Sequence, residues 1–211
     1  WGFVVFNCSN FDLSGQMIGN GNGQSVGLIA YQSSNFTIEG DISGPFGLIV
    51  SQSSNWFISG EIYGRDFGSI LTDTSNISIN GNLTSHFTGV SITGVSNLTF
   101  NGNLAAIAGF TIHSSSNFDI HCNLKTSSDA FSATNSSNLT FDGSIGSFVG
   151  IGFHSLNSTN FTIKGEILSP GKEGLHSVNS SNFRINATIG GKVGFHGESC
   201  SNFTFNNVIT G

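Results

Sequence analysis

The chain has 211 residues, of which only 9% are charged, whereas about a quarter are charged in an ordinary soluble domain. Its 29 glycines, 20 phenylalanines and only two prolines, with 37% hydrophobic residues, exclude collagen and proline-rich linkers and predict a packed core. The net charge of −6, with no cluster of Lys or Arg and no long apolar run, predicts neither nucleic-acid binding nor a membrane span.

A short motif of Ser or Thr, then Asn, then a large apolar residue recurs ten times along the chain. The spacings between its Asn residues are 25, 20, 21, 21, 20, 21, 22, 22 and 20. This period is typical of a solenoid and is too short for repeats of paired helices, which need about 33 residues or more. In chain order the motif residues are Asn10, Asn35, Asn55, Asn76, Asn97, Asn117, Asn138, Asn160, Asn182 and Asn202.

Each repeat predicts one strand before the Asn and one after it. After the Asn, apolar and polar residues alternate with period two, as in 36–42, which indicates a strand. The earlier strand begins at a Gly eight residues before the Asn, as at Gly27 and Gly109. All length changes fall between the second strand and the next such Gly, as in 18–23 and 168–172, so insertions are expected at one corner.

Stacking the repeats brings the ten Asn residues into one column at a polar corner. Asn tolerates left-handed backbone angles there and can hydrogen-bond to the coils above and below, so we expect an asparagine ladder. Residues 1–211 are therefore predicted to form one all-β domain, a parallel β-helix of about ten coils with 20–22 residues each and a stacked aromatic and aliphatic core. We expect right-handed coiling and a rod of about 48 Å.

The twenty-odd-residue period, the Asn column and an aromatic column of Phe161, Phe183 and Phe203 resemble features of the parallel β-helix superfamily. That superfamily includes pectin-lyase-like enzymes, phage tailspikes and the passenger domains of bacterial surface adhesins. The resemblance covers the whole chain and implies the architecture, but a shared fold does not imply a shared activity.

Glu39, Asp41 and Glu61 form the best candidate for catalytic chemistry. Neighbouring coils are expected to place Asp41 and Glu61 about 5 Å apart, close enough to bind Ca²⁺ or to act as a glycosidase pair. This pattern indicates, as an alternative function, a carbohydrate-active enzyme or a glycan-binding β-helix. A solvated edge of scattered acids is the simpler interpretation, and we expect no enzyme activity.

His154, His176 and His196 occupy the same column on three successive coils. A stack of imidazoles of this kind can bind a transition metal. However, repetition alone copies a side chain from coil to coil, and no acidic residue shares the column. We therefore expect no metal and no other cofactor.

Asn-X-Ser/Thr sequons are frequent. Those outside the ladder are expected to be exposed, and they are credible N-glycan sites if the source is a eukaryote, whereas a bacterial protein would carry them unmodified. Sequons on the ladder column, such as that of Asn97, are discounted because we expect the corner to bury their amides. The six candidate sites are Asn7, Asn82, Asn135, Asn157, Asn179 and Asn186.

The three cysteines cannot all pair, and Cys122 replaces a Gly that faces the core. Cys8 and Cys200 share a column at opposite ends of the rod, about 43 Å apart, so a disulfide can join them only between stacked molecules. Trp1 lies close to the position in the repeat at which a coil begins, and Gly211 lies close to the position at which a coil ends. We therefore expect either a window of a longer solenoid or a subunit that polymerises.

Together these features predict a structural protein that stacks head to tail on itself. The expected role is a component of an extracellular fibre, a surface appendage or an adhesin stalk, located outside the cell or on its surface. N-glycans would supply the hydrated surface that the low charge content leaves incomplete. Besides further copies of itself, glycans are the other possible partner.

Overall fold

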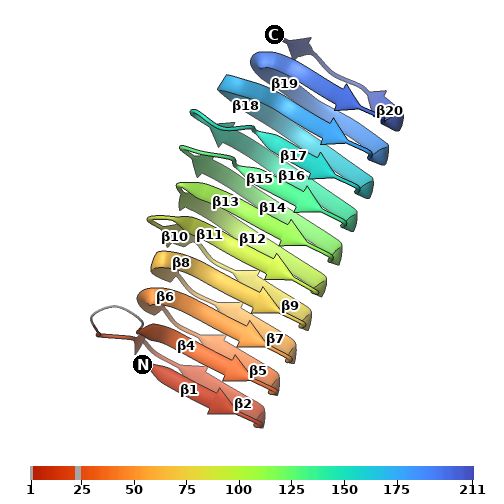
Figure 1. Cartoon of the computed structure of the whole chain (residues 1–211). Coiled ribbons are helices and arrows are strands. Elements are labelled where there is room, and N and C mark those ends of the chain that lie inside the picture. The colour runs from red at the N-terminus through yellow and green to blue at the C-terminus, as the bar shows by residue number, and fades with distance from the viewer. Residues whose placement is uncertain (1, 22–24) are drawn as a thin grey trace.

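The computed structural model describes residues 2–21 and 25–211, and this part of the chain contains 21 strands and no helix. The strands stack coil upon coil into a rod, with the two ends of the chain at opposite ends of the stack (Figure 1). The prediction of an all-β solenoid is confirmed. Trp1, and Asn22 and Gly23 of the longest predicted insertion, lie outside the described residues.

Each coil contributes to three sheet faces, which we call A, B and C in chain order. Face A, ahead of each ladder Asn, contains β1 (Phe3–Phe6), β4 (Val26–Tyr31), β11 (Thr88–Thr93), β13 (Ala108–His113), β15 (Phe131–Thr134) and β17 (Phe153–Leu156). Face B contains β2 (Ser9–Ser14), β5 (Ser34–Glu39), β7 (Ser54–Ser59), β9 (Ser75–Asn80) and β20 (Ser201–Phe205). Face C contains β3 (Met17–Ile18), β10 (Leu83–Ser85) and β21 (Ile209–Thr210).

The remaining strands run around corners and belong to more than one face. Two of them join face C to face A of the next coil: β6 (Ile42–Ser51) and β8 (Ile62–Thr72). Three join face B to face C: β12 (Ser96–Ala106), β14 (Ser116–Thr126) and β16 (Ser137–Ser147). The two longest pass through all three faces: β18 (Thr159–Val178) and β19 (Ser181–Glu198).

Neighbouring coils pair in parallel and in register. On face B, for example, Phe36 lies opposite Phe11 of the preceding coil and Trp56 of the following one. The predicted columns are therefore real columns of side chains. Right-handed coiling stays a prediction. Within the described part of the chain, no helix has the length and apolar character that crossing a bilayer requires.

The corner between faces A and B holds the predicted ladder. All ten motif Asn residues have left-handed backbone angles, with φ between 54° and 61°. From the second coil onward, each Nδ2 donates to the Oδ1 of the Asn one coil earlier, over 2.9–3.1 Å. The links are unbroken from Asn10 to Asn202, which confirms the ladder.

A second ladder, made by serines two residues before the Asn, lies beneath the first. Ser33 is buried, and its hydroxyl donates to the Tyr31 carbonyl over 2.9 Å. Its backbone N–H in turn donates to the Ser53 hydroxyl of the next coil, over 3.1 Å. Ser158 and Ser180 repeat the pattern. These hydroxyls satisfy backbone groups that the tight corner would otherwise bury unpaired.

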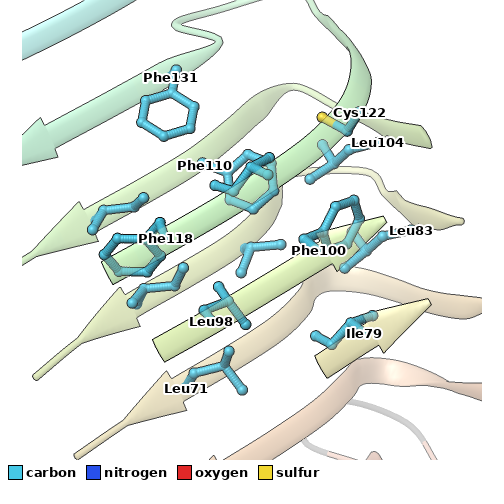
Figure 2. Packing of buried hydrophobic residues seen from close by; sticks show 14 of the residues in the cluster. Leu71, Ile79, Leu83, Leu98, Phe100, Leu104, Phe110, Phe118, Cys122 and Phe131 are labelled. Atoms are coloured by element: carbon cyan, nitrogen blue, oxygen red, sulfur yellow. The ribbon is translucent and has the colours of Figure 1, made fainter. Parts of the chain in front are cut away.

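The core lies between the three faces and consists of stacked aliphatic and aromatic side chains (Figure 2). The predicted aromatic column is present, with ring centroids 4.8 Å apart for Phe161 and Phe183 and 4.6 Å for Phe183 and Phe203. Cys122 is buried beside this core (Figure 2). Such burial removes apolar surface from water along the whole rod, and this is the main force holding the coils together.

The corner between faces B and C is built on glycine. Gly40 has a φ of 152°, and a Cβ added there would overlap the carbonyl oxygen of Gly15 in the coil beneath. A side chain at this bend would therefore force neighbouring coils apart. The chain changes direction here, so residues on either side of the bend lie on different faces.

Candidate functional site

The structure brings together only part of the predicted acidic cluster. Asp41 and Glu61 are neighbours, because the backbone N–H of Glu61 donates to the Asp41 carboxylate over 3.0 Å. Glu39 ends β5 on face B, and the bend at Gly40 separates it from the other two acids. Glu39 lines a different hollow, beside Asp12. The three carboxylates therefore do not converge on one point.

Asp41 and Glu61 nevertheless line a polar track along the start of face C. Together with Tyr63 they border an open hollow of about 280 Å³. A second hollow of about 470 Å³ continues from Glu61 past Asn82 toward Lys125. The Asn82 amide donates to the Glu61 carboxylate over 3.4 Å. Carboxylates, amides and one exposed aromatic ring in a continuous track are suitable groups for contacting a sugar chain.

The three predicted histidines stack as expected on face A. His176 lies opposite His154 of the preceding coil and His196 of the following one. The ring centroids of His154 and His176 are 5.1 Å apart, and those of His176 and His196 are 4.7 Å apart with nearly parallel planes.

No acidic residue shares the histidine column, as predicted, but two acids reach it from other columns. Glu173 lies 3.7 Å from His196 Nδ1, measured from its Oε1. The Oε1 of Glu198 lies 3.4 Å from His196 Nε2 and 3.9 Å from His176 Nε2. Both acids come from columns beside the histidine column. Glu173, His176 and His196 are a group able to hold a metal ion, with ligand atoms all within 4.8 Å of one another.

Local contacts set the electrostatics of this cluster. A hydrogen bond from its own backbone N–H lowers the pKa of the Glu173 carboxyl, and the neighbouring imidazoles act in the same direction. Burial lowers the pKa of His154, and His176 adds to that effect. Nε2 of His176 is buried and makes no hydrogen bond within the described residues. An unsatisfied buried polar atom costs about 1–3 kcal/mol.

The six predicted glycan sites are accessible to different degrees. Five of these Asn residues are exposed, whereas Asn186 is half-buried and accepts a 2.7 Å hydrogen bond from Asn206. Two of the exposed side chains also bond to each other, with Asn157 Nδ2 donating to Asn135 Oδ1 over 3.2 Å. Asn7, Asn82 and Asn179 complete the exposed set.

The expectation that the corner buries the ladder amides is wrong, because all ten ladder Asn residues are exposed. The ladder runs along the outer edge of the corner, and the serine ladder takes the buried position instead. Hydrogen bonding of the amide nitrogen to the preceding coil does not separate the two sets, because Asn82 and Asn157 of the candidate sites also make such a bond. On the ladder, each sequon amide nitrogen donates to the preceding coil, as Asn97 does to Asn76. A glycan attached there would replace an amide hydrogen in this crowded column.

The cysteines lie where the sequence places them, and all three are free thiols. Cys8 and Cys200 are half-buried on the first and last coils, in the column that contains the serine ladder. Burial raises the pKa of the Cys122 thiol to about 12.

Sequence reasoning missed one further hollow, at the corner between faces C and A. It has a volume of about 680 Å³ and is lined by the apolar side chains of Phe148, Leu168 and Pro170 between Lys125 and Lys192. Phe148 is 74% exposed. Because insertions differ in length at this corner, no column pattern in the sequence indicates which of these side chains meet.

Comparisons with known proteins give no relative from which a function could be transferred. The chain matches no protein-family model, no curated protein and no solved structure.

Proposed function

We propose that this protein is a structural rod of an extracellular fibre, a surface appendage or an adhesin stalk, and that it stacks head to tail. The observation that carries the proposal is the unbroken asparagine ladder from Asn10 to Asn202. A mechanical element benefits from such a ladder because every coil is tied to the next at the same point by both side-chain and backbone hydrogen bonds.

The ladder has a direction that suits end-to-end association. Each amide nitrogen donates toward the preceding coil, so Asn10 can donate from one end of the rod and Asn202 can accept at the other. The aromatic column offers a matching apolar contact, because Phe11 on the first coil is 39% exposed and Phe203 on the last is half-buried. A second copy stacked in register would continue both columns.

The end cysteines support the same register. Cys8 and Cys200 occupy the same column, so stacking one copy on another would bring them one coil step apart, about 4.8 Å. Disulfide-bonded cysteines have Cα atoms about 4.4–6.8 Å apart, which includes this spacing. In an oxidising extracellular compartment we therefore propose that a Cys8–Cys200 disulfide locks successive subunits.

N-glycosylation belongs to the same proposal. Exposed sequon asparagines at the outer edge of the corner, Asn135, Asn157 and Asn179, lie on three successive coils and would carry hydrated glycans along one edge of the rod. Intact mass before and after enzymatic deglycosylation of native material tests this part. A mass that falls supports it, and an unchanged mass at the chain's own 22.1 kDa contradicts it.

Sedimentation velocity over a range of protein concentrations tests the stacking. We expect wild-type chains to sediment faster as concentration rises, and Phe203→Asp to abolish the effect by placing a charge on the stacking end. Phe57→Asp makes the same chemical change on the side of the rod, where Phe57 is 42% exposed, and should associate like the wild type. Concentration-independent sedimentation of the wild type as a monomer would refute head-to-tail stacking.

Non-reducing electrophoresis of oxidised material tests the disulfide. We expect a ladder of covalent multimers from the wild type, collapse to single chains on reduction, and single chains only from Cys8→Ser. Multimers that persist in Cys8→Ser would contradict the proposed pairing.

Glycan binding along face C is the second candidate, favoured by the track that runs from Asp41 through Glu61 to Asn82. Titration with Ca²⁺ and with acidic oligosaccharides tests it. If neither binds, or if Asp41→Ala leaves binding unchanged, this candidate is excluded.

A further inference from the structure

Two stacked imidazoles on face A lie between two carboxylates near the C-terminal end of the rod. Glu173 approaches Nδ1 of His196 on one side, at 3.7 Å, and Glu198 approaches Nε2 of the same ring, at 3.4 Å. The side chain of His176 is only 19% exposed and lies directly beneath His196, with 4.7 Å between ring centroids. Four groups able to bind a metal or to orient its ligands therefore meet across two coils.

The surroundings of His176 Nε2 indicate which nitrogen of this ring is left to bind a metal. Its Nε2 is buried, makes no hydrogen bond within the described residues, and lies 3.9 Å from the nearest Glu198 oxygen. A neutral imidazole that coordinates a metal through one nitrogen keeps a hydrogen on the other and usually donates it to a carboxylate. Glu198 is placed to accept such a hydrogen from both rings.

We propose that Glu173, His176 and His196 bind a divalent transition-metal ion, with Zn²⁺ as the best-fitting ion, and that Glu198 orients the two imidazoles. We assign the Glu173 carboxylate and Nδ1 of each histidine as the ligand atoms, because both Nε2 atoms face Glu198. All four side chains come from one chain, so the assignment does not require a second copy stacked at the end of the rod.

The geometry requires a small rearrangement that the side chains can make. Ligand atoms of a tetrahedral zinc site, each about 2.0–2.1 Å from the metal, lie about 3.4 Å from one another. The distance from Glu173 to His196 Nδ1 is already 3.7 Å, and one ligand atom from each of the three residues lies within 4.8 Å of the other two. The two rings must therefore tilt toward each other, and His196 is free to do so because its side chain is 44% exposed.

The donor set selects the class of metal. Two imidazole nitrogens with one carboxylate oxygen suit Zn²⁺ and its neighbours in the first transition series, whereas Ca²⁺ and Mg²⁺ prefer sites made of oxygen alone. Three protein ligands also leave a fourth position for water.

The position of the ligands indicates what the ion does for the fold. Glu173 follows the insertion at 168–172, where the pairing of β18 with β19 shifts register between Ser169 and Glu173. His196 belongs to the following coil. A bound ion would therefore hold this irregular corner against the coil above it. Because the ion would bind the folded chain and not the unfolded chain, it would raise the Tm of the protein.

Isothermal titration of the intact, chelator-treated chain with Zn²⁺ tests the assignment. We expect one ion per chain, a loss of affinity of at least 100-fold in Glu173→Gln and in His176→Ala, and a loss of about 10- to 100-fold in Glu198→Gln. The matched control is His154→Ala, which removes a histidine of the same column one coil earlier and should change affinity less than three-fold.

Two further readouts separate loss of the site from loss of the fold. Far-UV circular dichroism checks that each variant keeps its strand content, and Glu173→Gln preserves the size of the side chain. The Co²⁺-loaded wild type should show the strong visible absorption of a four-coordinate site, and Glu173→Gln should not. The proposal is overturned if Zn²⁺ does not bind saturably, if Glu173→Gln binds like the wild type, or if His154→Ala loses binding as severely as His176→Ala.

Discussion

Replacing one ladder asparagine tests how the coils are held together. The Asn97 amide donates to Asn76 over 2.9 Å and accepts from Asn117 over 3.0 Å. Each such link contributes about 1 kcal/mol net, so removing both costs about 2 kcal/mol. Asn97 also has a φ of 59°, where a residue with an ordinary Cβ costs about a further 1 kcal/mol. Asn97→Ala should therefore destabilise the rod by about 3 kcal/mol.

Two matched variants separate these contributions. Asn97→Gly loses the same links but tolerates the left-handed angle, so we expect a cost of about 2 kcal/mol. Asn103→Ala removes a comparable pair of amide links, to Asn82 and Asn123, from a backbone without positive φ, and should cost about the same. In a chain of this size, 1 kcal/mol corresponds to about 2–4 °C in Tm.

Urea denaturation followed by far-UV circular dichroism measures these differences. We expect Asn97→Ala to be the least stable of the three variants, and the other two to lie between it and the wild type. If Asn97→Ala and Asn97→Gly unfold at the same urea concentration, the left-handed angle carries no cost. If neither differs from the wild type, the ladder does not stabilise the rod.

Three more predictions concern the core, a thiol and the surface. Gly109→Ala should lower Tm strongly, because its Cβ would overlap a carbonyl oxygen of the next coil. The control Gly146→Ala places a Cβ near only one atom, at 3.7 Å, and should change Tm by less than about 2 °C. Equal Tm values for the two variants would contradict this. After reduction of any disulfide under native conditions, a thiol-specific reagent at pH 8 should titrate two thiols of the folded chain. It should reach Cys122, with its pKa of about 12, only after denaturation, and rapid labelling of all three would contradict its burial. Lys164→Ala breaks an exposed ion pair 3.7 Å long and should change stability by less than about 0.5 kcal/mol, and a larger loss in the same assay would contradict this.

The fold was predictable because each repeat places the same residue type at the same phase. An Asn at every corner and alternating apolar residues after it specify columns, and the structure confirms them in the ladder and in stacked rings such as Phe183 and Phe203. The serine ladder could have been found in the same way. The Ser two residues before the Asn recurs in most repeats, which indicates a second column, although the pattern alone does not indicate that this column is buried.

The histidine cluster was only half predictable. Glu198 follows His196 by two residues, so period-two alternation puts both side chains on the same face of the strand. Glu173 precedes His176 by three residues, which in a straight strand would point it to the opposite face. It reaches the cluster because it lies at the irregular corner, where the pairing shifts register. Insertions carry no column pattern, so the sequence does not indicate such contacts.

A bend in the chain also explains why the three acids Glu39, Asp41 and Glu61 do not form one cluster. Glu39 and Asp41 are two residues apart, which in a continuous strand places them on one face. Gly40 between them turns the chain from face B toward face C and separates the two carboxylates. The prediction held only for Asp41 and Glu61, which occupy the same column on neighbouring coils.

The central claim is that the molecule is a rod which stacks end to end. Electron microscopy of the purified chain at micromolar concentration tests this claim most directly. We expect continuous rods of uniform width whose lengths are multiples of about 48 Å, the length of ten coils. A population made only of separate particles about 5 nm long, unchanged as concentration rises, would contradict the claim.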